Sequence, residues 1–361
     1  MRFKEFFSEI PFFPVKSYKM SLKNWKRNLG NVKRCLERSF EKILSQISLP
    51  LILWLFPIKS VIIETTNLCN LHCPLCPTQS SNRERGIMSF SDFLKIAESL
   101  PSSIQNVSLY LSGEPLINKS LFRMVTFLVN RDIYCSVSTN GTLPGEKIDK
   151  ILDSGLSELI IGVDGATEDT YKKYRKGGDF PALIENIRRL VQEKRKRCLK
   201  TPFIEIQFII MKHTEKEMDL AVKLAKDLKV DAISFISVSL GTHQTDESER
   251  KKLVSEYLPN DLSFSRYYID NTGMPINKWQ YNYCPLWKLP VILWNGDITV
   301  CCFDHNRLEV YGNILRKNFI DVWKSKEHFQ AVNKILFRKM SICKTCGLCS
   351  GDENRYLKFS Y

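Results

Sequence analysis

From residue 59 onward, short apolar runs alternate with amphipathic stretches along the chain. Six runs rich in β-branched residues predict strands at residues 61–65, 107–111, 133–137, 159–163, 204–210 and 232–236. Between them, apolar residues recur at helical spacing, most clearly over 183–191 after Pro181 and over 218–228 after the acidic turn near Glu215. Strands that alternate with helices favour a parallel sheet with crossover connections, either an open sheet or a partial barrel.

The first 58 residues have a different pattern. Residues 32–47 place apolar side chains at helical spacing opposite several lysines and arginines, which predicts a basic amphipathic helix. The apolar run that follows is interrupted by Pro50 and Pro57, and it is far shorter than the roughly 20 residues of a membrane-spanning helix. We therefore expect no transmembrane span, and a helix that either packs against the next domain or lies on a membrane surface.

Charge is concentrated in the same region. The net charge of the chain is +14. Residues 1–47 hold 11 Lys/Arg against 4 Asp/Glu, so this segment carries +7, half of the net charge. A basic balance favours anionic partners such as a membrane surface, a nucleic acid or a phosphorylated substrate, although a solvated helix face explains it equally well. No stacking platform or groove-reading motif supports nucleic acid, so a nucleic-acid partner is not expected.

Composition sets the class of protein. A chain of 361 residues with 43% hydrophobic and 25% charged residues has room for one large or two ordinary globular domains. Its 12 cysteines fall mostly in clusters with ligand-like spacing, and its first residues show no signal-peptide pattern. Both observations favour metal binding in the reducing cytoplasm over a disulfide framework.

Cys69, Cys73 and Cys76 are spaced Cys-x3-Cys-x2-Cys in one loop. Three thiolates can hold three irons of a cubane iron–sulfur cluster and leave the fourth iron open to a small molecule. The alternatives are a coincidence of spacing or a zinc knuckle that uses His72 as its fourth ligand.

Polar loops follow the first four predicted strands. The cysteine loop follows the first, Ser112-Gly-Glu-Pro115 the second, Ser138-Thr-Asn-Gly-Thr142 the third and Asp164-Gly165 the fourth. Ligands of parallel αβ folds bind at the carboxyl ends of the strands. The four loops are therefore expected to form one site.

With these motifs, the chain resembles the radical S-adenosylmethionine (radical SAM) superfamily over about residues 59–240. The resemblance implies an α/β fold with a partial (β/α)6, TIM-like barrel, and a [4Fe-4S] cluster whose open iron chelates S-adenosylmethionine (SAM). One electron, from a donor such as flavodoxin or ferredoxin, would cleave SAM to methionine and a 5′-deoxyadenosyl radical that abstracts hydrogen from the substrate.

The resemblance also implies roles for individual residues. Cys69, Cys73 and Cys76 would be the catalytic cluster ligands. Cofactor-binding residues would be Glu114 toward the methionine amino group, Ser138 and Asn140 toward the carboxylate or ribose, and Asp164 with Arg175 in a segment shared by relatives with a C-terminal extension. Many members have an aromatic residue where this chain has Leu75, which puts adenine stacking there in doubt.

A second cysteine set resembles the SPASM extension, a C-terminal module that carries auxiliary iron–sulfur clusters. The resemblance rests on Cys284, Gly296 and Cys301, the stretch Tyr311-Gly-Asn-Ile314, Trp323, and the run Cys343-x2-Cys346-x2-Cys349. One auxiliary cluster is expected, because Cys349 is the last cysteine and Asp352 stands where a further ligand would be sought. Its expected ligands are Cys284, Cys301, Cys343 and Cys346, with Cys302 and Cys349 as spares, and the alternative is a zinc ribbon of Cys301, Cys302, Cys343 and Cys346.

Together these patterns predict three parts: a basic helical extension over 1–58, a barrel core over 59–240 and a small iron–sulfur domain over 241–361. The expected function is a radical SAM oxidoreductase that takes hydrogen from an unactivated C–H bond of a small molecule, such as a sugar, aminocyclitol or lipid precursor. The basic helix slightly favours an anionic or membrane-associated substrate, with membrane-surface contact through residues 1–58. A radical SAM/SPASM maturase of ribosomal peptides and a non-catalytic zinc-binding scaffold are the alternatives.

Overall fold

The chain divides into two compact units, Met1–Ile52 and Leu53–Tyr361. The computed structural model describes residues 57–142, 145–240, 247–278, 289–336 and 355–360, all of which belong to the second unit. The predicted amphipathic helix over 32–47 and the auxiliary residues Cys284, Cys343, Cys346, Cys349 and Asp352 lie outside the described residues.

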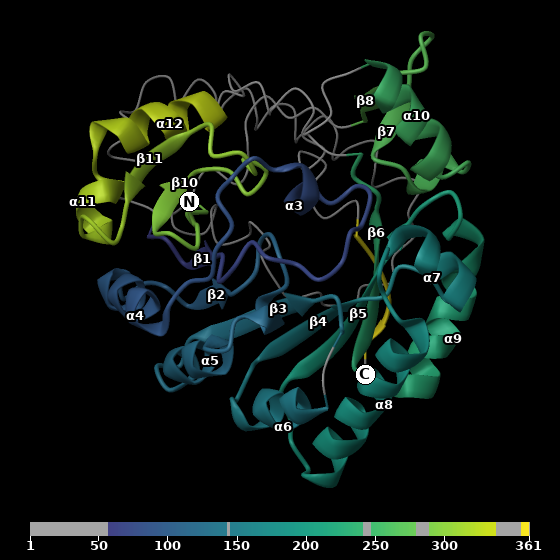
Figure 1. Ribbon diagram of the computed structural model, residues 1–361, viewed down its shortest axis with the longest axis horizontal. Helices are drawn as coiled ribbons and strands as arrows, with labels where there is room; N and C mark the ends of the chain where they lie inside the picture. The colour runs from purple at the N-terminus through teal and green to yellow at the C-terminus, as the bar shows by residue number, and fades with distance from the viewer. Residues whose placement is uncertain (1–56, 143–144, 241–246, 279–288, 337–354, 361) are drawn as a thin grey trace, which may run out of the picture. The chain divides into compact units, whose positions relative to one another are not determined.

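A parallel sheet forms the centre of the described fold (Figure 1). Its six strands pair in chain order, each parallel to the next. They are β1 (Ser60–Ile63), β2 (Asn106–Ser108), β3 (Tyr134–Thr139), β4 (Glu158–Gly162), β5 (Phe203–Ile210) and β6 (Ala232–Ser237). All six predicted strands are therefore confirmed, and an α/β fold with a partial TIM-like barrel is consistent with this order.

Helices connect the strands and cover the outer side of their arc in Figure 1. They are α3 (Pro77–Ser80), α4 (Phe90–Ser99), α5 (Leu121–Val129), α6 (Glu146–Asp153), α7 (Glu168–Tyr174), α8 (Phe180–Lys196) and α9 (Met218–Leu228). Short 3₁₀ turns η1 (Pro115–Ile117) and η2 (Glu215–Glu217) precede α5 and α9. The two helices predicted over 183–191 and 218–228 are confirmed as the middle of α8 and the whole of α9.

Local sequence explains where two of these helices begin. The Thr167 side chain accepts a hydrogen bond from the Thr170 N–H, and the Thr170 side chain accepts one from the Thr167 N–H, which makes a capping box for α7. The Asp179 carboxylate accepts from the Ala182 N–H, and Pro181 stands in the first turn of α8, where no hydrogen-bond donor is needed. Local hydrogen bonds therefore define the first residue of both helices, which follow one another after β4.

Side chains alternate in burial along the strands. On the helix-covered side, residues such as Val61, Leu159 and Ile206 are at most 1% exposed. On the concave side, Ser108, Ser138 and Gln207 are only half-buried. The apolar core therefore lies between sheet and helices, and the polar concave side faces the middle of the arc.

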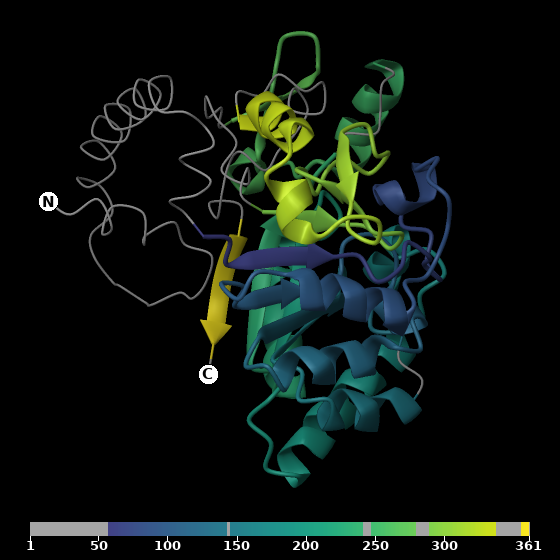
Figure 2. The ribbon, with the colours of Figure 1, turned by 90° about the vertical axis from the view of Figure 1, so that its left-hand side faces the viewer.

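The later part of the chain adds strands to both edges of the sheet (Figures 1 and 2). Strand β9 (Val291–Ile292) pairs parallel with β1, and β10 (Asp297–Thr299) and β11 (Val310–Asn313) follow as antiparallel strands. At the other edge, β12 (Arg355–Ser360) pairs antiparallel with β6. The sheet therefore has ten strands in the order β11-β10-β9-β1-β2-β3-β4-β5-β6-β12.

The remaining described elements lie between and after these strands. Helix α10 (Glu247–Tyr257), the 3₁₀ turn η3 (Leu262–Phe264) and the antiparallel pair β7 (Tyr267–Ile269) and β8 (Pro275–Asn277) follow β6, and α11 (Phe319–Trp323) and α12 (Lys326–Leu336) follow β11. Helix α11 packs against α4, and α12 packs against β11. None of the described helices has the length and apolar character needed to cross a membrane.

Candidate active site

The three-cysteine loop runs from the end of β1 to the start of α3. Cys73 is buried, and Cys69 and Cys76 are half-buried. Leu71 and Leu75, which are 1% and 4% exposed, anchor the loop in an apolar cluster with side chains from α7, α10 and β7, including Tyr174, Leu253 and Tyr267. Leu75 therefore contributes to packing.

Polar groups of this loop and of the loops after β3 and β4 lie beside two of these thiols. The Leu71 N–H lies 3.4 Å from the Cys69 sulfur, and the Asn140 amide nitrogen lies 3.9 Å from the same atom. The Arg175 Nη1 lies 3.9 Å from the Cys73 sulfur. Donors and a cation in these positions stabilise thiolates and compensate the charge of a metal centre that the thiolates hold.

Glu114 connects the second and third loops. It is 3% exposed, and its Oε1 accepts hydrogen bonds from the Leu116 N–H at 3.1 Å and the Thr139 hydroxyl at 2.8 Å. Its Oε2 accepts from the Asn140 N–H at 2.7 Å, and burial raises the pKa of this carboxyl above its ordinary value. A carboxylate has about four lone-pair sites, so three bonds leave Oε2 with acceptor capacity.

Asn140 occupies the centre of a small amide and hydroxyl network. Its Nδ2 donates to the Asn70 Oδ1 at 2.9 Å, and its Oδ1 accepts from the Thr142 N–H at 2.9 Å and the Thr142 hydroxyl at 2.6 Å. The Asn70 Nδ2 donates in turn to the Thr142 hydroxyl at 2.8 Å. The loop after β3 is thereby joined to the cysteine loop next to Cys69.

Asp164 and Arg175 form a buried ion pair after β4. The Asp164 Oδ2 lies 2.6 Å from both Nε and Nη2 of Arg175, and the Asp164 Oδ1 accepts from the Ile209 N–H at 2.9 Å. The side chains are 1% and 17% exposed. The pair joins the loop after β4 to β5 and holds the guanidinium beside Cys73.

Burial raises the pKa of two thiols of this loop. It raises the pKa of Cys73 to about 11, a rise that the neighbouring Arg175 guanidinium reduces, and it raises the pKa of Cys69. Because thiolates are the ligands, binding of a metal centre to Cys69 and Cys73 would release their protons.

The donor set fits a multi-iron cluster better than a single metal ion. Among the described residues, which include all three thiols of the loop, no group of three His, Cys, Asp or Glu side chains could hold one metal ion. A cubane cluster takes each thiolate on a different iron and needs no such convergence on one point. His72, the suggested zinc ligand, is exposed, which does not favour the zinc-knuckle alternative.

Other predicted residues lie further from the thiols or beyond the described part of the chain. Ser138 is half-buried in β3, in register with Ile160 of β4, on the concave side of the sheet. Cys301 and Cys302 follow β10; Cys301 is 8% exposed, and burial raises the pKa of Cys302 to about 12. Since the other auxiliary cysteines lie outside the described residues, the choice between an auxiliary cluster and a zinc ribbon stays a prediction.

Two residues of this region escaped the sequence interpretation. Glu64 and Arg83 form an ion pair between the end of β1 and the loop after α3, with side chains 0% and 4% exposed. The available signal was the charged residue Glu64 directly after the apolar strand residues 61–63, but nothing in the sequence identifies its partner.

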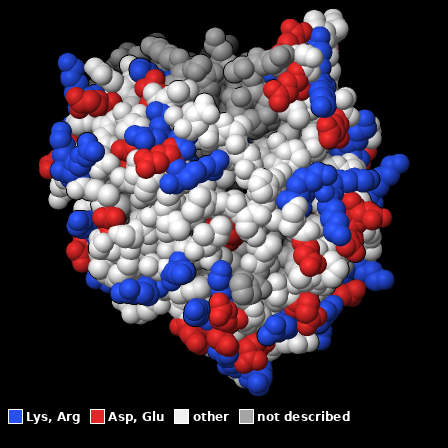
Figure 3. Space-filling model, viewed as in Figure 1, with Lys and Arg blue, Asp and Glu red and all other residues white. Residues whose placement is uncertain are grey.

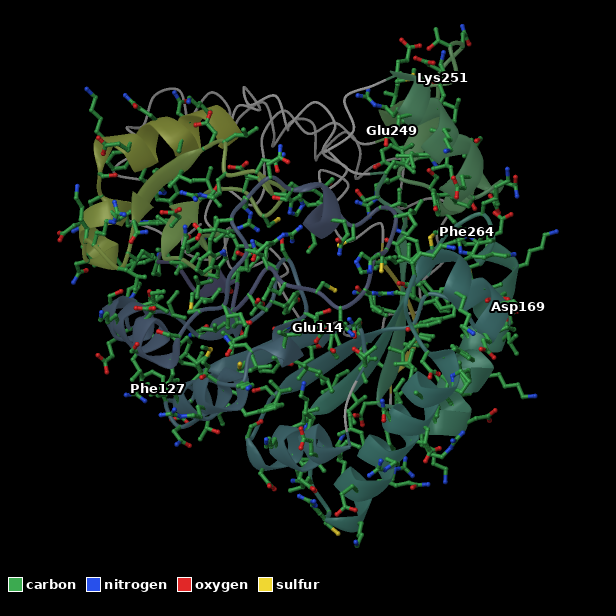
Figure 4. All side chains as sticks on the ribbon, viewed as in Figure 1. Glu114, Phe127, Asp169, Glu249, Lys251 and Phe264 are labelled. Atoms are coloured by element: carbon green, nitrogen blue, oxygen red, sulfur yellow. The ribbon has the colours of Figure 1, made fainter. Side chains whose placement is uncertain are left out.

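Figures 3 and 4 show this arrangement from the open side of the arc. Glu114 lies near the centre of the view in Figure 4, between the strands and α3, and Figure 3 shows the molecular surface hollowed at the same place. The loop after β2, which carries Glu114, therefore lies at this depression.

Comparison with known families addresses both cysteine sets. The model of the radical SAM superfamily matches residues 63–204, and that of the SPASM iron–sulfur cluster-binding domain matches residues 284–349. The chain belongs to the radical SAM superfamily. It is therefore an enzyme, and its cofactors are a [4Fe-4S] cluster and SAM, with auxiliary iron–sulfur binding in the SPASM segment.

Curated radical SAM relatives match most of the chain at low identity. The tungsten-containing aldehyde ferredoxin oxidoreductase cofactor-modifying protein of Pyrococcus furiosus is 23% identical over 81% of this chain and 88% of its own length. A probable GTP 3′,8-cyclase of Methanococcus maripaludis is 26% identical over 75% of this chain and 96% of its own length.

Solved structures share the radical SAM fold. The Streptococcus suis enzyme SuiB bound to its precursor peptide SuiA gives a TM-score of 0.58 at 18% identity, over 96% of this chain and 80% of that one. The enzyme anSMEcpe with bound AdoMet gives 0.55 at 16% identity, over 80% and 85%. At these identities the likeness concerns the fold, and it agrees with the partial barrel.

Proposed function

We propose that this enzyme uses Cys69, Cys73 and Cys76 to hold the SAM-binding cluster, and that it takes a hydrogen atom from an unactivated C–H bond of a small molecule. When bound, the cluster and SAM supply one-electron chemistry: reductive cleavage of SAM gives a 5′-deoxyadenosyl radical that removes the hydrogen. The observation that supports the proposal is the meeting of four strand-end loops, with Asn140 and Arg175 each 3.9 Å from a loop thiol.

The surrounding residues can bind and orient the cofactor. Glu114 retains acceptor capacity on Oε2 toward an ammonium group, since that oxygen receives one hydrogen bond, from the Asn140 N–H. Asn140 and Ser138 offer amide and hydroxyl groups toward a carboxylate or ribose. Arg175, held by Asp164, brings a positive charge to the cysteine loop.

An auxiliary cluster would provide an electron acceptor for the reaction. We assign Cys284, Cys301, Cys343 and Cys346 to one auxiliary [4Fe-4S] cluster, with the SPASM-like domain over 241–361 following a barrel core over 59–240. Such a cluster can accept the electron left on the substrate, which would make the net reaction a two-electron oxidation.

A peptide substrate is the second candidate. The specific observation in its favour is the match to SuiB, which was solved with a bound precursor peptide and covers 96% of this chain. A small molecule is favoured by the curated relatives, whose names describe cofactor modification and GTP cyclisation. Flavodoxin or ferredoxin is the electron donor that we propose in both cases.

Iron content tests the ligand assignment. After anaerobic reconstitution with iron and sulfide, we expect about eight irons per wild-type chain and about four after Cys69→Ala/Cys73→Ala/Cys76→Ala. Cys198→Ser changes an exposed cysteine that belongs to neither set and serves as the matched control. Wild-type iron content in the triple variant would overturn the assignment, and four irons in the wild type would remove the auxiliary cluster.

A further inference from the structure

A buried ion pair joins the barrel to the start of the SPASM segment. Arg83 Nη1 donates to Glu64 Oε2 at 2.8 Å, and Arg83 Nη2 donates to Glu64 Oε1 at 2.6 Å. Two parallel hydrogen bonds of this kind fix the orientation of the guanidinium relative to the carboxylate. The two side chains are 0% and 4% exposed. Removal of one charge would therefore leave the other buried and unpaired, at a large cost in folding free energy.

Glu64 reaches the segment that leads to Cys301. The Glu64 N–H donates to the Ile292 carbonyl at 2.8 Å, and the Glu64 Oε2 lies 3.4 Å from the Trp294 N–H. The backbone of Glu64 therefore continues the hydrogen bonding between β1 and β9 beyond the end of β1. Its side chain adds a contact to Trp294, two residues after the end of β9. The turn after β9, seven residues before Cys301, is bound to the end of β1.

Arg83 reaches the SAM-binding side. Its Nη2 lies 3.4 Å from the Ser112 hydroxyl, in the same loop as Glu114. Ser81, two residues earlier, donates through its hydroxyl to the His305 carbonyl at 2.8 Å, four residues beyond Cys301. The loop after α3 thus contacts both the loop after β2 and the loop after β10.

The Trp294 ring completes the contact. A Cβ at Gly86 would lie 2.3 Å from the indole, so only glycine lets the ring lie this close to the backbone. The indole Nε1 also lies 3.4 Å from the Glu84 carbonyl. Asn67, two residues before Cys69, accepts from the Gly86 N–H at 2.8 Å and donates to the Glu84 carbonyl at 2.7 Å.

From these contacts we propose that Glu64 and Arg83 are positioning residues that hold the auxiliary-cluster loop at Cys301 in a fixed place relative to the Cys69–Cys76 loop. The inference rests on the proposed ligands of the two clusters. Neither residue touches the reacting atoms; both act by joining the segments 81–88 and 291–305. A fixed separation matters because electron transfer between the centres depends steeply on distance.

Hydrogen exchange by mass spectrometry on the full reconstituted chain tests the link. Arg83→Met keeps the side-chain length without the charge, and we expect at least tenfold faster amide exchange in both 81–88 and 291–305. Glu64→Gln/Arg83→Met leaves no buried charge without its partner, so its exchange in both segments should lie between that of Arg83→Met and that of the wild type. Arg83→Lys keeps the charge without the paired donation and should give an intermediate rate.

Lys194→Met is the matched control. Lys194 is also a largely buried cation, bonded to Asp231 at 2.6 Å between α8 and the β5–β6 connection. The Lys194→Met variant should show amide exchange in 81–88 and 291–305 within twofold of the wild type. Equal exchange in Arg83→Met and wild type, or an equal rise in Lys194→Met, overturns the proposal.

A spectroscopic measurement tests the functional half. In the fully reduced enzyme, each paramagnetic cluster speeds relaxation of the other, so we expect Arg83→Met to lower the half-saturation microwave power of the first cluster at least twofold. Faster exchange without this change would show a purely structural link and overturn the positioning role. Failure of the proposed function looks different: the wild type would hold no cluster, while hydrogen exchange would still report the link.

Discussion

Replacing Glu114 with glutamine removes one charge at the point where the second and third loops meet. The carboxylate accepts from Leu116 N–H, Thr139 hydroxyl and Asn140 N–H. Glutamine has one oxygen and one NH₂ group, so in either orientation a buried N–H faces another donor. Hydrogen bonds to charged groups contribute about 1.5–3 kcal/mol each. We expect Glu114→Gln to lower the free energy of unfolding by about 1–3 kcal/mol, because relief of the buried charge offsets part of the loss.

The same variant should weaken SAM binding more than it weakens the fold. If Glu114 receives the methionine ammonium group, a lost charge-assisted hydrogen bond of about 1.5–3 kcal/mol corresponds to roughly 10- to 100-fold in Kd. The assay is equilibrium dialysis of SAM against the anaerobically reconstituted protein, with iron content measured on the same sample.

Thr139→Val is the control for this prediction. It removes one donor to the carboxylate and keeps the charge, so it should cost about 0.5–1.5 kcal/mol of stability and change the SAM Kd less than about threefold. A Glu114→Gln protein with full iron content that binds SAM within twofold of wild type would refute the assigned role.

Three further predictions concern other parts of the chain. Gly141 has φ +75, and a Cβ there would lie 2.2 Å from the Leu183 Cδ1, so Gly141→Ala should lower stability to urea unfolding by about 1–3 kcal/mol; an unchanged midpoint would contradict this. Burial lowers the pKa of His328, bonded through Nδ1 to the Trp323 carbonyl, to about 4. Since the unfolded pKa is about 6.5, stability should fall by about 3 kcal/mol as pH drops from about 6.5 to about 4, and His328→Phe should flatten this slope in a pH series of unfolding curves. Deletion of 1–47, which carries 11 Lys/Arg against 4 Asp/Glu, should reduce sedimentation with anionic liposomes; equal sedimentation would exclude membrane-surface contact through this segment.

The strands and the two clearest helices could be predicted because their signals are local. Runs such as 204–210 are β-branched and short, and 218–228 keeps one apolar face, so each element is recognisable without its neighbours. The rule that parallel strands place ligands at their carboxyl ends then located the loops of Glu114 and Asn140 beside the cysteine loop.

Long-range pairings could not be predicted in this way. Nothing in the local pattern of β9 or β12 shows that they extend the sheet beyond β1 and β6, because the pairing depends on residues far away in the chain. The same holds for Glu64 and Arg83, whose burial depends on their contact with each other. Glu114 was predicted as a ligand group, but its bonds within the fold appear only in three dimensions.

We propose that Cys69, Cys73 and Cys76 support reductive cleavage of SAM. The most direct measurement is 5′-deoxyadenosine formed after the anaerobically reconstituted protein is mixed with SAM and dithionite, quantified by mass spectrometry. We expect 5′-deoxyadenosine and methionine from the wild type and from Cys198→Ser, and none above background from Cys69→Ala/Cys73→Ala/Cys76→Ala. Equal yields from wild type and the triple variant, or no product from a wild type with full iron content, would contradict it.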